Sequence, residues 1–263
     1  MDIIKFPGLR IEFNISRVAF EFLEISIYFY AVCIVLGIGV AFILARISKE
    51  KFGIKYEKLI EIMVGGIVCG YIGARLYYVV FNFNYYISNP SQILNFRDGG
   101  LAIYGGLIFS SIFVCVKCKK EKINFLDFGD YIVPFVAIAQ SIGRWGNFFN
   151  KEAYGISTLN FLRMGIFNYY GEYVEVHPTF LYESIATFII FIFLRLLQKN
   201  RKFSGQILYL YIIFYSFIRI FIEGLRVDSL MLGYFRVSQI LSLILFTFFS
   251  YILLKKNKEY CEK

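Results

Sequence analysis

The sequence contains few of the residues on which soluble enzymes and multidomain chains usually depend. Among 263 residues there are one histidine, four prolines and only 18% charged residues. The single histidine, His177, leaves a histidine-rich metal site without ligands. Because proline is scarce and no serine- or proline-rich tract occurs, the sequence also excludes domains joined by flexible linkers. We therefore expect one domain over residues 1–263.

Motifs of soluble enzymes are also missing. The sequence has no GxSxG elbow, no HExxH zinc motif and no GxxxxGK[ST] phosphate loop. Its five cysteines do not form a disulfide framework, since Cys33 and Cys69 lie in apolar runs and Cys115 and Cys118 form one isolated CxxC pair. We expect neither a metal ion nor a cofactor.

Apolar residues dominate instead. They make up 58% of the chain, aromatic residues make up 20%, and the mean hydropathy is +0.62. A chain of this length cannot hide so much apolar surface in its own core, so we expect the bilayer to be its solvent. A spanning helix needs about 20 mostly apolar residues. The candidate segments are 27–45, 59–81, 101–116, 131–142, 179–194, 205–222 and 237–254, of which 101–116 and 131–142 are short and need flanking residues to span. The expected count is seven spans, with six or eight as alternatives.

The basic residues predict the orientation. The formal net charge is +9, and most lysines and arginines follow the first, third, fifth and seventh apolar segments. The positive-inside rule makes these loops cytoplasmic. The expected fold is an all-α polytopic membrane protein of about seven transmembrane helices, with its N-terminus outside and its C-terminus cytoplasmic. Anionic membrane lipids, and not nucleic acid, are the expected partners of the basic loops.

One segment on the outer side is unusually polar. Residues 143–155 read GRWGNFFNKEAYG and open the predicted main external loop, 143–178. Arg144 and Glu152 lie close together beside an apolar helix, and glycine allows a ligand to approach the backbone. A broken or re-entrant segment that lines a polar cavity would explain this composition, and so would an ordinary polar loop.

Further charges lie inside the sixth apolar segment. Arg219, Glu223 and Arg226 fall on one helical face, with Tyr215 one turn earlier. Charge at membrane depth needs a partner or a polar cavity. One reading is an internal ion pair between Arg219 and Glu223, one turn apart. The other is an outward-facing site for an anion such as a lipid phosphate, which the planar fork of arginine binds through two hydrogen bonds.

Two other short motifs lie at the starts of apolar segments. Residues 98–107 read DGGLAIYGGL, with Tyr104 between two glycine pairs, and could bring backbone N–H groups against a lipid headgroup. Residues 177–183 read HPTFLYE and open the fifth segment.

Together these motifs resemble the signature of the prolipoprotein diacylglyceryl transferases. The GRWGNF block, continued by Glu152 and Gly155, is the most specific part of the resemblance. The blocks stand in the expected order and cover nearly the whole chain, beginning with Tyr30 in the first apolar segment. The resemblance implies an enzyme of the bacterial inner membrane whose active site faces the outer, periplasmic side.

The resemblance also implies the reaction and its substrates. A diacylglyceryl group moves from phosphatidylglycerol to the thiol of the lipobox cysteine in a prolipoprotein signal peptide, which is the first step of lipoprotein maturation. Arg144 would bind the headgroup, Asn147 and Glu152 would complete its polar shell, and Arg219 and Arg226 would neutralise the leaving phosphate. The other substrate-binding residues implied are Tyr30, Gly155, Tyr215 and Glu223.

The sequence leaves the identity of the general base open. Tyr104 occupies a position where several relatives carry a histidine, and a tyrosine near its reference pKa of about 10 is a poor base at pH 7. The catalytic set is then Arg144, Arg219, Tyr104 and Glu152. Either Glu152 or Glu223 accepts the thiol proton, or arginine charge lowers the thiol pKa without a base.

An alternative function is a membrane transporter or binding protein for an anionic lipid or organic anion. It would use the same arginines. Against it, the sequence shows no internal repeat and no matched pair of interrupted helices, which many transporters have.

These role assignments predict an order of effects. We expect Tyr104→Phe to cost less transferase activity than Arg144→Ala, because a neutral phenol contributes less to phosphate binding than a guanidinium does. Mass spectrometry of a lipobox peptide incubated with phosphatidylglycerol and each variant measures the effect. The reverse order would overturn the assignments.

Overall fold

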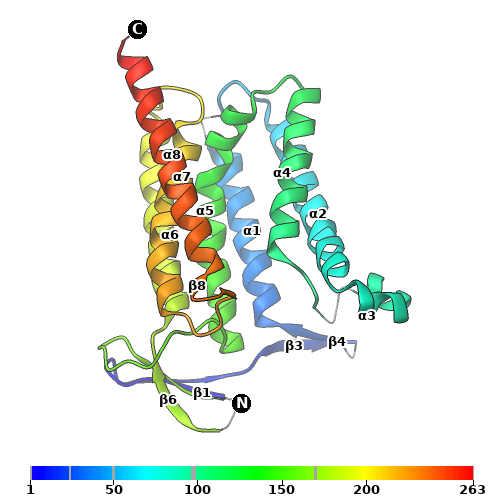
Figure 1. Cartoon of the computed structure of the whole chain (residues 1–263), viewed down its shortest axis with the longest axis vertical. Coiled ribbons are helices and arrows are strands. Elements are labelled where there is room, and N and C mark those ends of the chain that lie inside the picture. The colour runs from blue at the N-terminus through cyan, green and yellow to red at the C-terminus, as the bar shows by residue number, and fades with distance from the viewer. Residues whose placement is uncertain (1, 24, 49–50, 96–98, 169–170, 263) are drawn as a thin grey trace. The chain divides into compact units, whose positions relative to one another are not determined.

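The computed structural model describes residues 2–23, 25–48, 51–95, 99–168 and 171–262 (Figure 1). The chain divides into two compact units. The first comprises residues 1–50 and 130–263, and the second comprises residues 51–129. Asp98 of the glycine motif lies outside the described residues.

The helices follow the predicted apolar segments closely. In the first unit they are α1 (Phe29–Ile47), most of α5 (Phe125–Asn150), α6 (Thr179–Gln198), α7 (Gln206–Leu225) and α8 (Val237–Cys261). In the second unit they are α2 (Tyr56–Phe81), the short α3 (Phe83–Ser88), a 3₁₀ turn at Pro90–Leu94, and α4 (Ile103–Lys120). Each predicted segment overlaps one long helix.

Six of the described helices are long and apolar enough to cross a membrane. The exception among the long helices is α4, which carries Lys117, Lys119 and Lys120 in its last turn. The helices also leave apolar surface uncovered, since only 6% of the most apolar stretch of α8 and 22% of that of α1 are buried. Mostly helical and rich in such helices, the chain is consistent with a polytopic membrane protein.

Short strands make the all-α expectation wrong at several places. β1 (Asp2–Phe6), β2 (Ile11–Ile15), β5 (Met164–Phe167) and β6 (Tyr173–Val176) form an antiparallel sheet in the order β2-β1-β5-β6. Two hairpins are separate: β3 (Val18–Phe22) with β4 (Ile25–Tyr28), and β7 (Met231–Leu232) with β8 (Phe235–Arg236). These strands have two to five residues. Long apolar runs in the sequence predict helices but cannot predict strands of this length.

The four-stranded sheet packs against two helix ends. Ile4 and Ile166 of the sheet share a buried cluster with Phe148 of α5 and Phe180 of α6. The sheet therefore covers the end of the bundle at which α5 finishes and α6 begins. Residues 143–150, the start of the predicted loop 143–178, form the last turns of α5.

α1 and α5 pack unusually closely. A Cβ atom added to Gly37 of α1 would lie 2.8 Å from the carbonyl oxygen of Ala139 in α5, so glycine permits the approach. Near the end of α1 and the start of α5, the hydroxyl of the buried Tyr131 donates to the carbonyl of Ala45 at 2.9 Å.

Within the second unit, Arg75 of α2 is buried and organises a loop. Its guanidinium donates to the carbonyl oxygens of Gln92, Ile93, Gly99 and Gly100 at 2.6–3.0 Å. Arg75, which lies in the second apolar segment, therefore has hydrogen-bond partners in its own unit. A charged side chain at membrane depth requires such partners.

At the opposite end of the first unit from the sheet, Asp130 of α5 holds the start of α7. Its fully buried carboxylate accepts hydrogen bonds from the N–H groups of Gly205 and Leu208 at 2.7 and 2.8 Å, and from Arg201 at 2.9 Å. A carboxylate at this position satisfies helix N–H groups that have no partner within the helix and interacts favourably with the helix dipole.

We predict that Asp130→Ala lowers the free energy of unfolding by about 3–5 kcal/mol, because it removes a fully buried acceptor from two backbone N–H groups and from Arg201. Denaturant unfolding in detergent micelles measures the change. The control is Glu259→Gln, whose exposed pair with Lys256 should be worth less than about 1 kcal/mol. Equal losses in the two variants would contradict the role of Asp130.

Candidate active site

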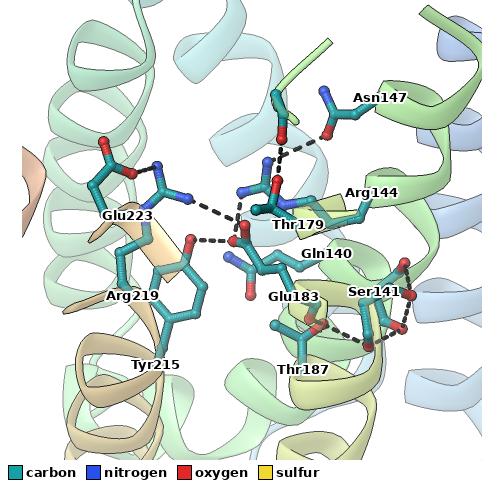
Figure 2. A network of polar contacts seen from close by, with 12 residues as sticks. Gln140, Ser141, Arg144, Asn147, Thr179, Glu183, Thr187, Tyr215, Arg219 and Glu223 are labelled. Carbon is teal, nitrogen blue, oxygen red and sulfur yellow. Dashed lines mark hydrogen bonds and ion pairs between the residues drawn. The ribbon is translucent and has the colours of Figure 1, made fainter. Parts of the chain in front are cut away.

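The carboxylate of Glu183 is the centre of a buried polar cluster in the first unit. It accepts hydrogen bonds from Arg144 of α5 at 2.6 Å, and from Tyr215 and Arg219 of α7 at 3.0 and 3.1 Å (Figure 2). Only 2% of Glu183 is exposed. A single carboxylate from α6 therefore joins two guanidinium groups and a phenol that come from two other helices.

Local contacts explain why α5 and α6 meet at this point. Ser141 and Ser184 exchange hydrogen bonds, each hydroxyl donating to the other residue's carbonyl at 2.8 Å. Thr179, at the first turn of α6, donates to the carbonyl of Ala153 (Figure 2). Small hydroxyl residues let helices approach and link them through hydrogen bonds in an apolar environment. These contacts fix Glu183, next to Ser184, opposite Arg144.

A second carboxylate, that of Glu223, adds negative charge to the cluster. Arg219 Nη2 lies 2.6 Å from Glu223 Oε2, and Glu223 is 2% exposed. The same oxygen accepts no well-aligned hydrogen bond from any residue that the structure describes, so the contact is an ion pair of poor hydrogen-bond geometry. The pairing that the sequence predicts between Arg219 and Glu223 is thus present, and Glu183 adds to it.

Arg144 and Arg219 stay partly accessible. Their side chains are 23% and 16% exposed. A guanidinium has five N–H donors in a fixed fork, so each can hold a carboxylate and still offer donors to an anion. In a low dielectric such donors, already fixed in place, interact strongly with an anion.

The signature segment supplies the neighbouring amides. Arg144 Nη1 lies 3.4 Å from the side-chain oxygen of Asn147, which is buried. The amide nitrogen of Asn147 donates to Glu152 at 2.8 Å, and that of Asn150 donates to the same oxygen at 3.3 Å. The structure thus connects Arg144, Asn147 and Glu152, which the sequence groups together.

Glycines explain two further close contacts. A Cβ atom on Gly146 would lie 2.7 Å from the ring of Tyr30, so glycine lets Tyr30 pack on the signature helix. A Cβ atom on Gly155 would lie 2.7 Å from that of His177, whose carbonyl accepts the Gly155 N–H at 2.9 Å. Burial lowers the pKa of His177, which favours the neutral ring at pH 7.

Arg226 has a different environment from Arg219. α7 ends at Leu225, and Arg226 beyond it forms a two-bond pair with Asp228 at 2.8 and 2.7 Å. Burial opposes ionisation of Asp228, but the hydrogen bond and charge of Arg226 outweigh it and lower the pKa of the carboxyl. Arg219 and Glu223 therefore join the cluster directly, whereas Arg226 pairs with Asp228 beside it, close enough to interact electrostatically with Glu223 and Arg144.

One predicted residue belongs to the other unit, and the structure adds further residues to the cluster. Tyr104, half-buried in α4, belongs to the second unit, whereas the cluster belongs to the first. The site set drawn from the sequence did not include Glu183, Ser141, Ser184 or Asp228. One sequence feature could have indicated Glu183: it is the only acidic residue in an otherwise mostly apolar segment, and it lies near the start of that segment.

The fold and this cluster define a class: a helical, multi-pass membrane protein with an arginine–carboxylate site among three helices. Residues 17–255 match the family model described as prolipoprotein diacylglyceryl transferase. Two curated relatives are similar along most of their length, and both are named phosphatidylglycerol–prolipoprotein diacylglyceryl transferase.

The relative from Clostridioides difficile (strain 630) is 48% identical over 229 residues, which cover 87% of this chain and 90% of the relative. The one from Clostridium novyi (strain NT) is 44% identical over 247 residues, covering 92% of this chain and 96% of the relative. The chain therefore belongs to the prolipoprotein diacylglyceryl transferase family.

The geometry predicts that Glu183 also stabilises the fold. Glu183→Ala leaves two partly buried arginines without their shared acceptor, and we expect a loss of about 3 kcal/mol in the free energy of unfolding. Glu152→Gln is the matched control, because Glu152 is exposed and the substituted amide keeps an oxygen acceptor. Thermal unfolding in detergent compares them, and an unchanged midpoint for Glu183→Ala would contradict a structural role.

Proposed function

We propose that this chain transfers the diacylglyceryl group of phosphatidylglycerol to the cysteine thiol of prolipoproteins. The sulfur forms a thioether bond to the glyceryl carbon, the bond from that carbon to the phosphate oxygen breaks, and glycerol phosphate leaves. The thiol proton passes, as the bond forms, to a carboxylate such as Glu152 or Glu223 or to the departing phosphate. The observation that carries this proposal is the Glu183 cluster, two arginines held at fixed positions in a chain of this family.

The cluster can stabilise the negative charge that develops on the phosphate during this reaction. A phosphodiester bears one negative charge, and its monoester product gains charge as the bond to carbon breaks. Arg144 and Arg219, held by Glu183, would meet the phosphate oxygens with N–H groups that need no reorganisation. Glu183 is in this proposal a positioning residue, whereas the two arginines contact the substrate.

The remaining residues would complete the site. Asn147 and Glu152 would bind hydroxyl groups of the headgroup, and Tyr30 and Tyr215 would line the wall. Arg226, paired with Asp228 beyond the helix end, would meet the leaving phosphate as it departs. The nucleophile belongs to the substrate, so the chain itself needs no catalytic cysteine or serine.

We also propose the membrane layout. Seven spans, with α4 as the third, would place the N-terminus outside and the C-terminus in the cytoplasm. Within the first unit, the Glu183 cluster joins the end of α5, the start of α6 and the end of α7. Basic residues such as Arg195 and Lys255 lie toward the opposite helix ends. By the positive-inside rule, this polarity supports a site on the outer face of a bacterial inner membrane.

The substrates proposed are phosphatidylglycerol and the lipobox region of prolipoprotein signal peptides. The names of the relatives contain phosphatidylglycerol and prolipoprotein. Family membership gives no support to the transporter alternative, and a product carrying a thioether-linked diacylglyceryl group distinguishes the two.

We predict that Arg219→Ala lowers the turnover number by about 100- to 1,000-fold, the usual cost of removing one donor that stabilises developing charge. Arg219→Lys should recover part of the loss, because it keeps the charge without the planar fork. Mass spectrometry of a lipobox peptide with purified enzyme and phosphatidylglycerol measures the product.

The matched control is Arg163→Ala, which removes an arginine paired with Glu175 near the four-stranded sheet. It should retain most of the activity. Comparable losses at Arg163 and Arg219, in variants with equal thermal midpoints, would refute the role of the cluster.

A further inference from the structure

The β3–β4 hairpin has one wholly apolar face. The two strands form a sheet of their own, and the register pairs Phe20 with Ile27 and Phe22 with Ile25. Because opposite residues of an antiparallel pair point to the same side, these four side chains share a face. Glu21 lies on the other face. The hairpin is therefore amphipathic.

Nothing in the described chain covers most of this face. Phe20 is 54% exposed, Phe22 62% and Ile25 45%. An isolated two-stranded hairpin is only marginally stable in water and needs a third element against its apolar side. These side chains therefore lie open in the described structure.

Leu23, which directly follows β3, combines a strained backbone with an exposed apolar side chain. Its φ is +47°, a left-handed conformation that costs energy for every residue with a Cβ atom. Its side chain is also 79% exposed. Glycine or asparagine would suit this conformation better in water, whereas a leucine side chain is favoured where its surroundings are apolar.

The position of the hairpin in the chain identifies those surroundings. β4 ends at Tyr28, and α1 begins at the next residue. α1 has a mean hydropathy of 2.3 over its most apolar stretch, only 22% of which is buried. The chain from Leu23 to Phe29 reaches at most about 20 Å, so the hairpin cannot leave the vicinity of the bilayer surface. Its open edges need water, which keeps it out of the hydrocarbon centre.

We infer that the β3–β4 hairpin lies in the lipid–water interface of the membrane that α1 crosses. Phe20, Phe22, Leu23 and Ile25 enter the boundary between headgroups and acyl chains, and Glu21 faces water. The occupant of the apolar face is lipid. This inference depends on α1 being a span and is independent of the proposed transferase activity.

The hairpin also leads directly to the candidate site. Phe29, the first residue of α1, stacks on Phe149 with ring centroids 4.4 Å apart. Tyr30 packs on Gly146 of the signature. Insertion of the hairpin would therefore fix the depth of the end of α1 against which the signature helix packs.

The experiment uses tryptophan fluorescence in the full chain. Trp145 is the only tryptophan, so Trp145→Phe gives a silent background. In it, Phe22→Trp places a probe on the apolar face and Glu21→Trp places one on the opposite face of the same strand. Each variant is reconstituted into phosphatidylcholine–phosphatidylglycerol vesicles with and without bromine on the acyl chains.

We expect Phe22→Trp to emit at short wavelength and to lose most of its fluorescence to brominated acyl chains, while Glu21→Trp keeps most of its own. Ile25→Trp, opposite Phe22, repeats the test on the partner strand if Phe22→Trp does not fold. Equal, weak quenching on both faces would overturn the inference. So would short-wavelength emission at residue 22 without lipid quenching, because this would indicate a protein partner such as a second copy.

Discussion

The ion-pair network around Glu183 is the constraint on which the rest of the site depends. A carboxylate that is only 2% exposed needs ion pairs and hydrogen bonds to offset the cost of its burial. Arg144, Arg219 and Tyr215 meet this requirement from two different helices. The same contacts hold two guanidinium groups at fixed positions with donors to spare, which is the property that a phosphate-binding site needs.

The surrounding fold serves to keep these three helices in place. Ser141 and Ser184 link α5 and α6 beside the cluster, and Asp130 holds the start of α7 at the other end. The small sheet packs on Phe148 and Phe180, where α5 ends and α6 begins. Each of these contacts joins elements far apart in sequence, so that Arg144 and Arg219 face one carboxylate although they are 75 positions apart in the sequence.

The sequence predicts the helices well because a long apolar run has few alternatives in a bilayer. It predicts the Arg219–Glu223 pair because the spacing of four residues is local to one helix. Glu183 could not be assigned as the shared partner, since that depends on how α6 packs against α5 and α7. Periodicity places Arg226 on the face of Arg219, but it cannot show that α7 ends at Leu225 or that Arg226 pairs with Asp228. The strands are too short, and residues 143–150 too rich in glycine and asparagine, for their structures to be read from pattern alone.

The central claim is that Arg144 and Arg219 bind the lipid phosphate as a pair. Isothermal titration calorimetry of a short-chain phosphatidylglycerol into purified protein tests it most directly, with Arg144→Lys/Arg219→Lys as the variant that keeps the charge. We predict saturable binding to the wild-type chain and a large loss of affinity in the double variant, because lysine cannot reproduce two-bond contacts. Undiminished affinity in a folded double variant would contradict the claim.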